Sequence, residues 1–241
     1  MEKYQFKDLI LFEDEDYIVI NKPSGIATLD DRNIASITSI LEMAREYCAT
    51  AQVCHRLDKE TSGALAIAKN PVAYRGLSMQ FENRTVKKVY HAVCDGIHDF
   101  KDSKITATIS TLSKGAVKID PYKGKPAETT VNTVRAYKIH TLVACEPLTG
   151  RMHQIRIHLS SVGAPISGDE QYGGQKVFLS KVKRRFNLKK DTEEQPLIKR
   201  VALHASGLGF RSTNNEKNIT IEAPYPKDFA VLLKQLDKNS R

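Results

Sequence analysis

The sequence predicts an α+β fold in which helices flank a central, mainly antiparallel sheet. Short apolar or alternating segments recur along the whole chain, and only a few segments have the 3.6-residue spacing of a helix. Strands and helices do not alternate strictly, which disfavours a doubly wound parallel sheet. With 241 residues, the chain is long enough for one large domain, or for two lobes of one, with a substantial core.

The first part of the chain contains two predicted strands and one predicted helix. Residues 16–21 form a strand that stops at Lys22-Pro23-Ser24-Gly25, and residues 63–69 form a buried strand. Between them, Ser36 is the predicted cap of a helix, because apolar residues follow it at helical spacing. These residues are Ile37, Ile40, Leu41, Ala44 and Tyr47.

Asn70-Pro71 is typical of a helix start, and the pattern after it continues one apolar face. Residues 86–94 alternate with period two, which places Tyr90 on the same face of a strand as Ala92 and Cys94. A strand Tyr is more often a core aromatic than a catalyst. Further strands are predicted at 106–112, 129–139, 142–146, 203–205 and 219–221, and further helices at 152–162, 177–190 and 229–233.

The helix at 152–162 has a buried face and a polar face. Its apolar stripe consists of Met152, Ile155, Leu159 and Val162, and Gly163 is expected to end the helix. Arg156 lies off this stripe and is therefore predicted to point into a cleft while the stripe anchors the helix. The alternative for Arg156 is a surface salt bridge.

Composition indicates an anionic partner. The net charge is +9 and the isoelectric point is about 9.3, so nucleic acid is the first candidate and an anionic membrane surface is the alternative. The chain has neither an apolar run near the roughly 20 residues needed to span a bilayer nor a signal pattern at its start, so we expect a cytoplasmic protein that does not bind membranes. The four Cys residues are scattered, which predicts reduced thiols and no structural zinc.

The densest positive charge lies between residues 181 and 200. It includes Lys183, Arg184 and Arg185, which we expect to contact RNA phosphates. The alternative is an ordinary solvated face.

The most informative segment is residues 55–63, His55-Arg56-Leu57-Asp58-Lys59-Glu60-Thr61-Ser62-Gly63. It places one acid, Asp58, in a turn-like segment between two apolar runs. A carboxylate that is flanked by basic residues and backed by buried strands would be rigid and directed outward, which suits a nucleophile or an electrostatic stabiliser. The alternative is a loop Asp that only hydrogen-bonds its own turn.

These nine residues resemble the signature loop of the RluA-type pseudouridine synthases. Several other blocks of the chain resemble that family and occur in the family's order, which is more specific than a single motif. They are Lys22-Pro23-Ser24-Gly25, residues 88–96 around Tyr90, residues 149–159 around Arg156, Gly168-Asp169-Glu170-Gln171-Tyr172-Gly173, and Leu203-His204-Ala205.

The resemblance implies an RNA pseudouridine synthase, an isomerase that needs no cofactor or metal. It implies that Asp58 is the essential carboxylate, that Tyr90 packs on the flipped base and transfers a proton or only stacks, and that Arg156 pairs with Asp58. Leu203 would form part of the pocket wall. The expected RNA contacts are Arg56, Arg151, His153 and Lys22, together with the cluster at 183–185.

The resemblance also implies a single catalytic domain over residues 1–241 whose sheet carries a basic cleft. The first block begins by residue 22, so we expect no α-L RNA-binding domain before it, and we expect a monomer. One departure is Arg211-Ser212, where many relatives have His-Pro. The substrate is ribosomal or transfer RNA, and the modified uridine is left open.

Two rivals remain beside this interpretation. The first is a non-catalytic RNA-binding protein on the same scaffold, which the presence of Asp58, Tyr90 and Arg156 argues against. The second is a metal-free hydrolase that cleaves nucleosides with Asp58 as nucleophile. It would need a second carboxylate to activate water, and Glu60 is the nearby candidate.

Overall fold

A computed structural model describes residues 4–29, 39–112, 115–188 and 192–240. The chain forms two compact units. The first unit comprises Met1–Val89 and His204–Pro224, and the second comprises Tyr90–Leu203 and Tyr225–Arg241. The single catalytic domain over residues 1–241 stays a prediction.

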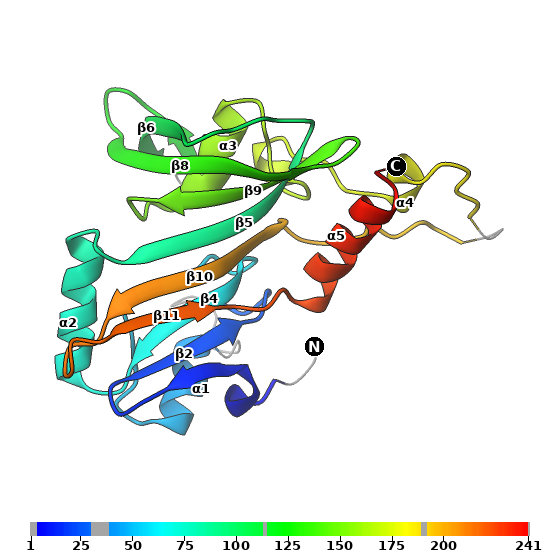
Figure 1. The fold of residues 1–241 in the computed structure, drawn as a ribbon. Helices are drawn as coiled ribbons and strands as arrows, with labels where there is room; N and C mark the ends of the chain where they lie inside the picture. The colour runs from blue at the N-terminus through cyan, green and yellow to red at the C-terminus, as the bar shows by residue number, and fades with distance from the viewer. Residues whose placement is uncertain (1–3, 30–38, 113–114, 189–191, 241) are drawn as a thin grey trace. The chain divides into compact units, whose positions relative to one another are not determined.

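The first unit is built on a sheet with the strand order β1-β2-β4-β10 (Figure 1). Within it β1 pairs with β2 and β2 with β4 in antiparallel fashion, whereas β4 and β10 are parallel. The short β3 pairs with β4, and β11 pairs with β10. The bounds are β1 Ile10–Glu13, β2 Tyr17–Lys22, β3 Gln52–Val53, β4 Ser62–Ala68, β10 Leu203–Arg211, whose first residue belongs to the second unit, and β11 Asn218–Glu222.

Two helices of the first unit begin at local capping signals. Helix α2 (Pro71–Glu82) has Asn70 as its N-cap, which accepts a hydrogen bond from the Ala73 amide at 2.9 Å, and Pro71 occupies the first turn. This start is therefore confirmed. Helix α1 (Ile40–Tyr47) is capped by Ser39; the predicted cap Ser36 lies outside the described residues. A 3₁₀ turn, η1 (Phe6–Leu9), precedes β1.

The second unit contains an antiparallel sheet with the order β5-β9-β8-β6-β7. Its strands are β5 Lys87–Asp95, which begins in the first unit, β6 Ser103–Thr111, β7 Val117–Ile119, β8 Lys125–Ala136 and β9 His140–Pro147. The predicted strands at 106–112, 129–139 and 142–146 are thus confirmed, and the mainly antiparallel pairing is confirmed as well. The sequence patterns missed β1, β3 and β7, which are short.

Two helix predictions in the second unit need correction. Helix α3 (Gln154–Ser161) begins two residues later than expected, and Val162 is exposed rather than part of the buried face. The predicted basic helix over 177–190 is wrong: α4 covers only Leu179–Val182, and Lys183 is already extended. Arg185 has a left-handed backbone with φ +52°, which a regular α-helix does not accommodate, and residues 189–190 lie outside the described residues.

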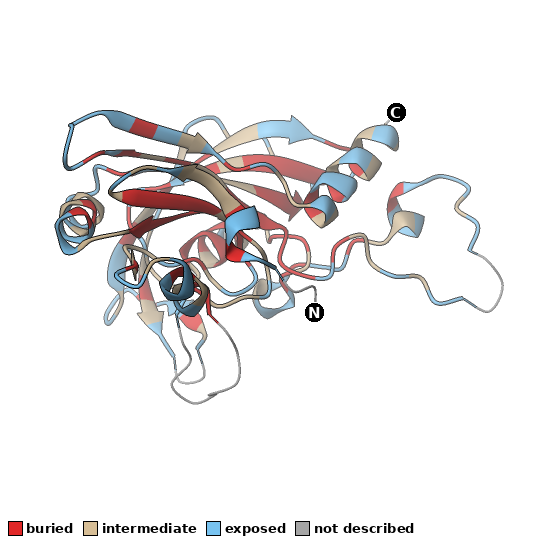
Figure 2. Ribbon diagram, turned by 90° about the horizontal axis from the view of Figure 1, so that it is seen from below, coloured by how far each residue is buried: buried red, intermediate tan, exposed pale blue. Residues whose placement is uncertain are grey.

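The hydrophobic core of the second unit is formed by residues of β5, β6, β8 and β9, of α3 and of the closing helix α5 (Lys227–Lys238). Phe229, Leu232 and Leu236 recur at helical spacing and form the buried face of α5, whose opposite face is exposed (Figure 2). The first unit has a separate core around β2, β4 and α2. All four Cys residues are free thiols, as predicted. Within the described residues, no helix has the length and apolar character needed to cross a membrane.

Candidate active site

Asp58 lies in the loop between β3 and β4 of the first unit. The loop closes on a turn in which the Thr61 amide donates to the Asp58 carbonyl at 3.0 Å. All seven residues of β4, which follows directly, are buried. Asp58 itself is half-buried. Its carboxylate is carried by a short loop that leads directly into this buried strand. The predicted turn and the buried strand after it are confirmed, whereas β3 before the turn is half-buried rather than buried.

His55 fixes the start of the same loop. Its Nε2 accepts a hydrogen bond from the Ala66 amide at 3.0 Å, and its ring stacks on Phe81 with the centroids 4.6 Å apart. Burial lowers the pKa of His55 to about 3, so the ring is neutral near pH 7 and keeps the lone pair that accepts this bond. His55 is therefore a structural residue of this loop.

The segment 22–28 forms the other side of the loop. The Gly25 amide donates to the Lys59 carbonyl at 2.8 Å, and the Ser24 hydroxyl donates to the Glu60 carbonyl at 2.8 Å. The Thr28 hydroxyl both accepts from the Leu57 amide and donates to the Leu57 carbonyl. These bonds tie the backbone on both sides of Asp58 to one neighbouring segment.

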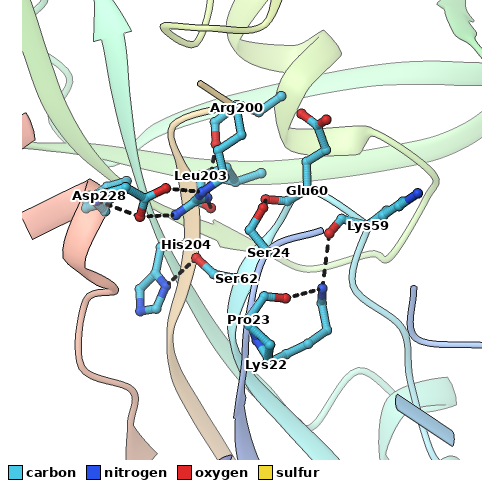
Figure 3. Close-up of polar contacts among 12 residues, drawn as sticks. Lys22, Pro23, Ser24, Lys59, Glu60, Ser62, Arg200, Leu203, His204 and Asp228 are labelled. Carbon is cyan, nitrogen blue, oxygen red and sulfur yellow. Dashed lines mark hydrogen bonds and ion pairs between the residues drawn. The ribbon is translucent and has the colours of Figure 1, made fainter. Parts of the chain in front are cut away.

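Lys22 is the buried centre of this segment. It is fully buried, and its ammonium donates to the carbonyls of Pro23 and Lys59 at 2.9 and 3.2 Å (Figure 3). It also donates to the carbonyl of Ile26 at 2.7 Å. The prediction that Lys22 contacts RNA is therefore corrected. Because its charge is buried against backbone carbonyls, it holds the Asp58 loop instead of presenting a cation to a phosphate.

Replacing Lys22 with Met should lower the free energy of unfolding by about 2 to 4 kcal/mol, because the methyl thioether fills the space but leaves three carbonyls without their donor. Denaturant unfolding measures the change. Lys59→Met is the matched control, since the Lys59 side chain is exposed and only its backbone takes part. A loss for Lys22→Met no larger than that of the control would contradict the clamp role.

The start of β4 is fixed against β10 within the first unit. Ser62 Oγ bonds His204 Nδ1 at 2.9 Å (Figure 3). His204 Nε2 lies 3.1 Å from the Ala223 carbonyl oxygen. Gly63 has φ +116°, and a Cβ there would lie 2.2 Å from the Ala205 carbonyl oxygen. Only glycine permits this close approach, which explains Gly63 at the end of the Asp58 block.

Tyr90 and Leu203 belong to the second unit. Tyr90 lies on β5 in register with Cys145 and packs, half-buried, against the core. Leu203 is buried, and its carbonyl accepts from Arg200 Nη1 at 3.1 Å. Arg200 is in turn paired with Asp228 through Nε at 2.7 Å (Figure 3). The position of Leu203 is thereby set by a buried arginine.

Arg156 lies on α3 and is buried, with about a tenth of its side chain exposed. Its Nε and Nη2 donate to the two carboxylate oxygens of Asp169 at 2.6 and 2.7 Å, and Nη2 also donates to Gln171 at 3.0 Å. The guanidinium carbon lies 4.9 Å from the ring centroid of Tyr172. The sequence noted the block that contains these three residues but gave none of them a role.

The other predicted RNA contacts differ in exposure. Arg56 is exposed, and so are Lys183, Arg184 and Arg185, which follow α4. Arg151 is half-buried and donates from Nε to the Pro126 carbonyl at 3.2 Å. His153 is the N-cap residue of α3 and bonds the Tyr172 hydroxyl at 2.8 Å, so it lies beside Arg156.

The predicted residues are thus distributed over both units. The second unit brings Arg156 and His153 together, whereas Asp58 belongs to the first unit and Tyr90 to the second. The pairing of Asp58 with Arg156 stays a prediction, and so does the basic cleft. Among the described residues, no group of three or more His, Cys, Asp or Glu side chains is placed to hold a metal ion.

Comparisons with known proteins show the family of this chain. A family model described as RNA pseudouridylate synthase matches residues 16–161. The chain is 36% identical over 236 residues to the ribosomal large subunit pseudouridine synthase C of Buchnera aphidicola, covering 96% of this chain and 71% of that protein. It is 34% identical over 241 residues to an uncharacterized RNA pseudouridine synthase of Bacillus subtilis, covering 95% and 73%.

A solved structure gives the same result at the level of the fold. Human RNA pseudouridylate synthase domain containing 1 is 26% identical, with a TM-score of 0.68, and the match covers 94% of this chain and 87% of that chain. Both the family model and the relatives span the Asp58, Tyr90 and Arg156 blocks. The chain belongs to the RluA-type family of RNA pseudouridine synthases.

Proposed function

We propose that this RNA pseudouridine synthase modifies uridines of ribosomal RNA, with Asp58 as its essential catalytic residue. The observation that carries the role of Asp58 is its loop, which the segment 22–28 and the buried strand β4 hold from both sides. The choice of ribosomal RNA is supported by relatives that are named ribosomal large subunit pseudouridine synthases. Transfer RNA is the second candidate substrate.

The reaction moves the uracil without adding or removing atoms. The glycosidic carbon–nitrogen bond breaks, the base turns, and a carbon–carbon bond forms to the same ribose. The base carbon that forms this bond loses its proton, and the ring nitrogen released from the glycosidic bond gains one, so the atoms balance. Asp58 attacks the anomeric carbon or the base ring, or stabilises a charged sugar intermediate. The target base has to leave its stack, and the detached base has to stay trapped.

Three further residues are proposed to complete the site. Tyr90 packs on the flipped base and transfers the proton or only stacks. Arg156 pairs with Asp58 and orients its carboxylate. Leu203 forms part of the pocket wall, a role that its burial and its fixed carbonyl support.

RNA affinity is proposed to come from exposed cations outside the chemistry. Arg56 beside Asp58 and the cluster Lys183, Arg184 and Arg185 would contact phosphates, and their exposure supports this role. Arg151 and His153 are further contacts close to Arg156. We also propose that the protein acts as a monomer in the cytoplasm, without binding membranes.

Mapping of pseudouridines in total RNA, with and without this protein, tests the function directly. We expect specific ribosomal uridines to lose the modification when the protein is absent and to regain it when it is restored. An assay for free uracil separates the rival hydrolase, because an isomerase releases none. Unchanged modification in all RNA, or stoichiometric uracil release, would contradict the proposal.

Replacing Lys183, Arg184 and Arg185 together with Ala should raise the Michaelis constant and leave saturated turnover nearly unchanged, because these residues are proposed to bind phosphates only. Each lost phosphate contact should also lower the log–log salt slope of RNA binding by about 0.7 to 0.9. Binding titrations at several salt concentrations measure the slope.

A variant with Ala at Lys227, Lys234 and Lys238 is the matched control for this cluster. It removes the same charge from exposed positions of α5 in the same unit. If both triple variants change the slope equally, the cluster has only a general electrostatic effect. If neither changes it, the cluster is a solvated face and the RNA contacts are elsewhere.

A further inference from the structure

We propose that Asp169 and Tyr172 are positioning residues for Arg156, and that this is the function of the block Gly168-Asp169-Glu170-Gln171-Tyr172-Gly173. The inference rests on the proposed function, because it concerns the role of Arg156 in that reaction. All of its contacts lie within the second unit.

The Asp169 carboxylate faces the guanidinium of Arg156 with two parallel bonds. Both side chains are buried, with 1% of the Asp169 side chain and 10% of the Arg156 side chain exposed. A bidentate pair fixes the plane of the guanidinium as well as its position. It uses the edge formed by Nε and Nη2, and Nη1 is not part of the pair. Asp169 therefore sets which edge Arg156 directs toward other groups.

Tyr172 supports the guanidinium from its face. Its ring lies under the guanidinium carbon, and its hydroxyl is held by two further elements. His153 Nδ1 lies 2.8 Å from this hydroxyl, and the Val117 amide donates to it at 3.0 Å. The Tyr172 carbonyl accepts from Ser160 Oγ at 2.7 Å, which links the ring back to α3. These three hydrogen bonds fix the position of the Tyr172 ring within the protein itself.

The backbone of the block is shaped for this purpose. The Tyr172 and Gly174 amides both donate to the Asp169 carbonyl, at 3.1 and 2.8 Å, so the chain folds into the 3₁₀ turn η2 (Glu170–Tyr172). A Cβ at Gly174 would lie 1.8 Å from the Ile166 carbonyl oxygen, and Gly173 has φ +93°. The glycines therefore permit a turn that returns both side chains to the same arginine.

This arrangement gives Arg156 a fixed orientation and a counter-charge, both of which a buried catalytic cation needs. A long arginine side chain has many rotamers, and a buried guanidinium without a counter-charge is costly. Asp169 supplies the charge and Tyr172 supplies the surface, so the guanidinium is preorganised and no reorganisation is needed during the reaction. Misplacement of such a group by about 1 Å costs on the order of 10²-fold in rate.

A double-mutant cycle in the full chain tests the inference. Asp169→Ala should lower saturated turnover on a ribosomal RNA transcript by on the order of 10²-fold, with the Michaelis constant and RNA affinity nearly unchanged. In an Arg156→Ala background, the same replacement should cause no further loss, because Asp169 acts through Arg156. An equal loss in both backgrounds, or wild-type turnover for Asp169→Ala, would overturn the inference.

One more variant keeps the test decisive if Asp169→Ala does not fold. Asp169→Asn keeps the shape of the side chain and one acceptor oxygen, but removes the charge. Asp120→Asn is the matched control, since Asp120 is also a buried carboxylate of the second unit and pairs with Lys118 at 3.0 Å. The two variants are compared at a temperature where circular dichroism shows both of them to be folded. Asp169→Asn should then have lowered turnover, and Asp120→Asn should have the turnover of the wild type. An equal loss in both variants would overturn the inference.

Tyr172 gives an independent check. Tyr172→Phe keeps the ring under Arg156 and should retain most turnover, whereas Tyr172→Leu should lose about 10-fold or more. Equal activity of the two variants would exclude the stacking role. Failure of the proposed function gives a different result from failure of the positioning role. The wild-type protein would then form no pseudouridine, or the Arg156→Ala variant would have wild-type turnover.

Discussion

Replacing Asp58 with Asn should abolish turnover, with a loss on the order of 10⁴-fold or more, while RNA affinity changes little. The carboxylate is proposed to act in the transition state, whereas phosphate contacts supply most of the affinity. Removing a residue that forms the reacting bond has effects of this size in other enzymes. The turn around Asp58 uses its backbone carbonyl, so Asn should fold in the same way.

Glu60→Gln is the matched control for Asp58→Asn. It removes a carboxylate from an exposed position two residues away, in the same turn. Single-turnover rates and RNA dissociation constants of the two variants should be compared with those of the wild type. Near wild-type turnover for Asp58→Asn would remove the proposed catalytic residue. Loss of activity in both variants, with uracil release by the wild type, would favour the hydrolase.

Replacing Tyr90 with Phe should lower saturated turnover by roughly 10²-fold or more if the hydroxyl transfers a proton, which is the usual contribution of a general acid or base. Phe keeps the ring that packs against the core, so the fold should not change. Thermal unfolding checks this, and the turnover of uridine in an RNA transcript measures the effect.

Tyr137→Phe provides the comparison for Tyr90→Phe. Tyr137 is a buried aromatic of the same core, with no proposed contact to RNA. Tyr137→Phe removes the hydroxyl of this residue and should leave turnover unchanged. If Tyr90→Phe is as active as this control, Tyr90 only stacks on the base and the proton is transferred by another group.

Elements that carry their own boundary signals could be predicted from the sequence. Helix α2 starts where Asn70 and Pro71 require it, because capping and the missing amide of proline are local chemistry. The strand β4 was visible as an apolar run bounded by turn residues. The basic segment after Val182 was predicted to continue a helix and does not: Lys183 is extended and Arg185 has a left-handed backbone with φ +52°, which no local signal in the sequence indicated.

Some features of the candidate site could likewise be predicted from the sequence, and others could not. The sequence by itself determined the family, the Asp58 loop and the chemistry, because ordered blocks of residues carry that information along the chain. Only the tertiary structure decided that Lys22 is buried and that Asp169 holds Arg156. The burial of Lys22 depends on two carbonyls of the segment directly after it and on a third from the distant Asp58 loop, and this third contact has no local signature in the sequence. The ion pair between Arg156 on a helix and Asp169 in a loop 13 residues further on has no local signature either.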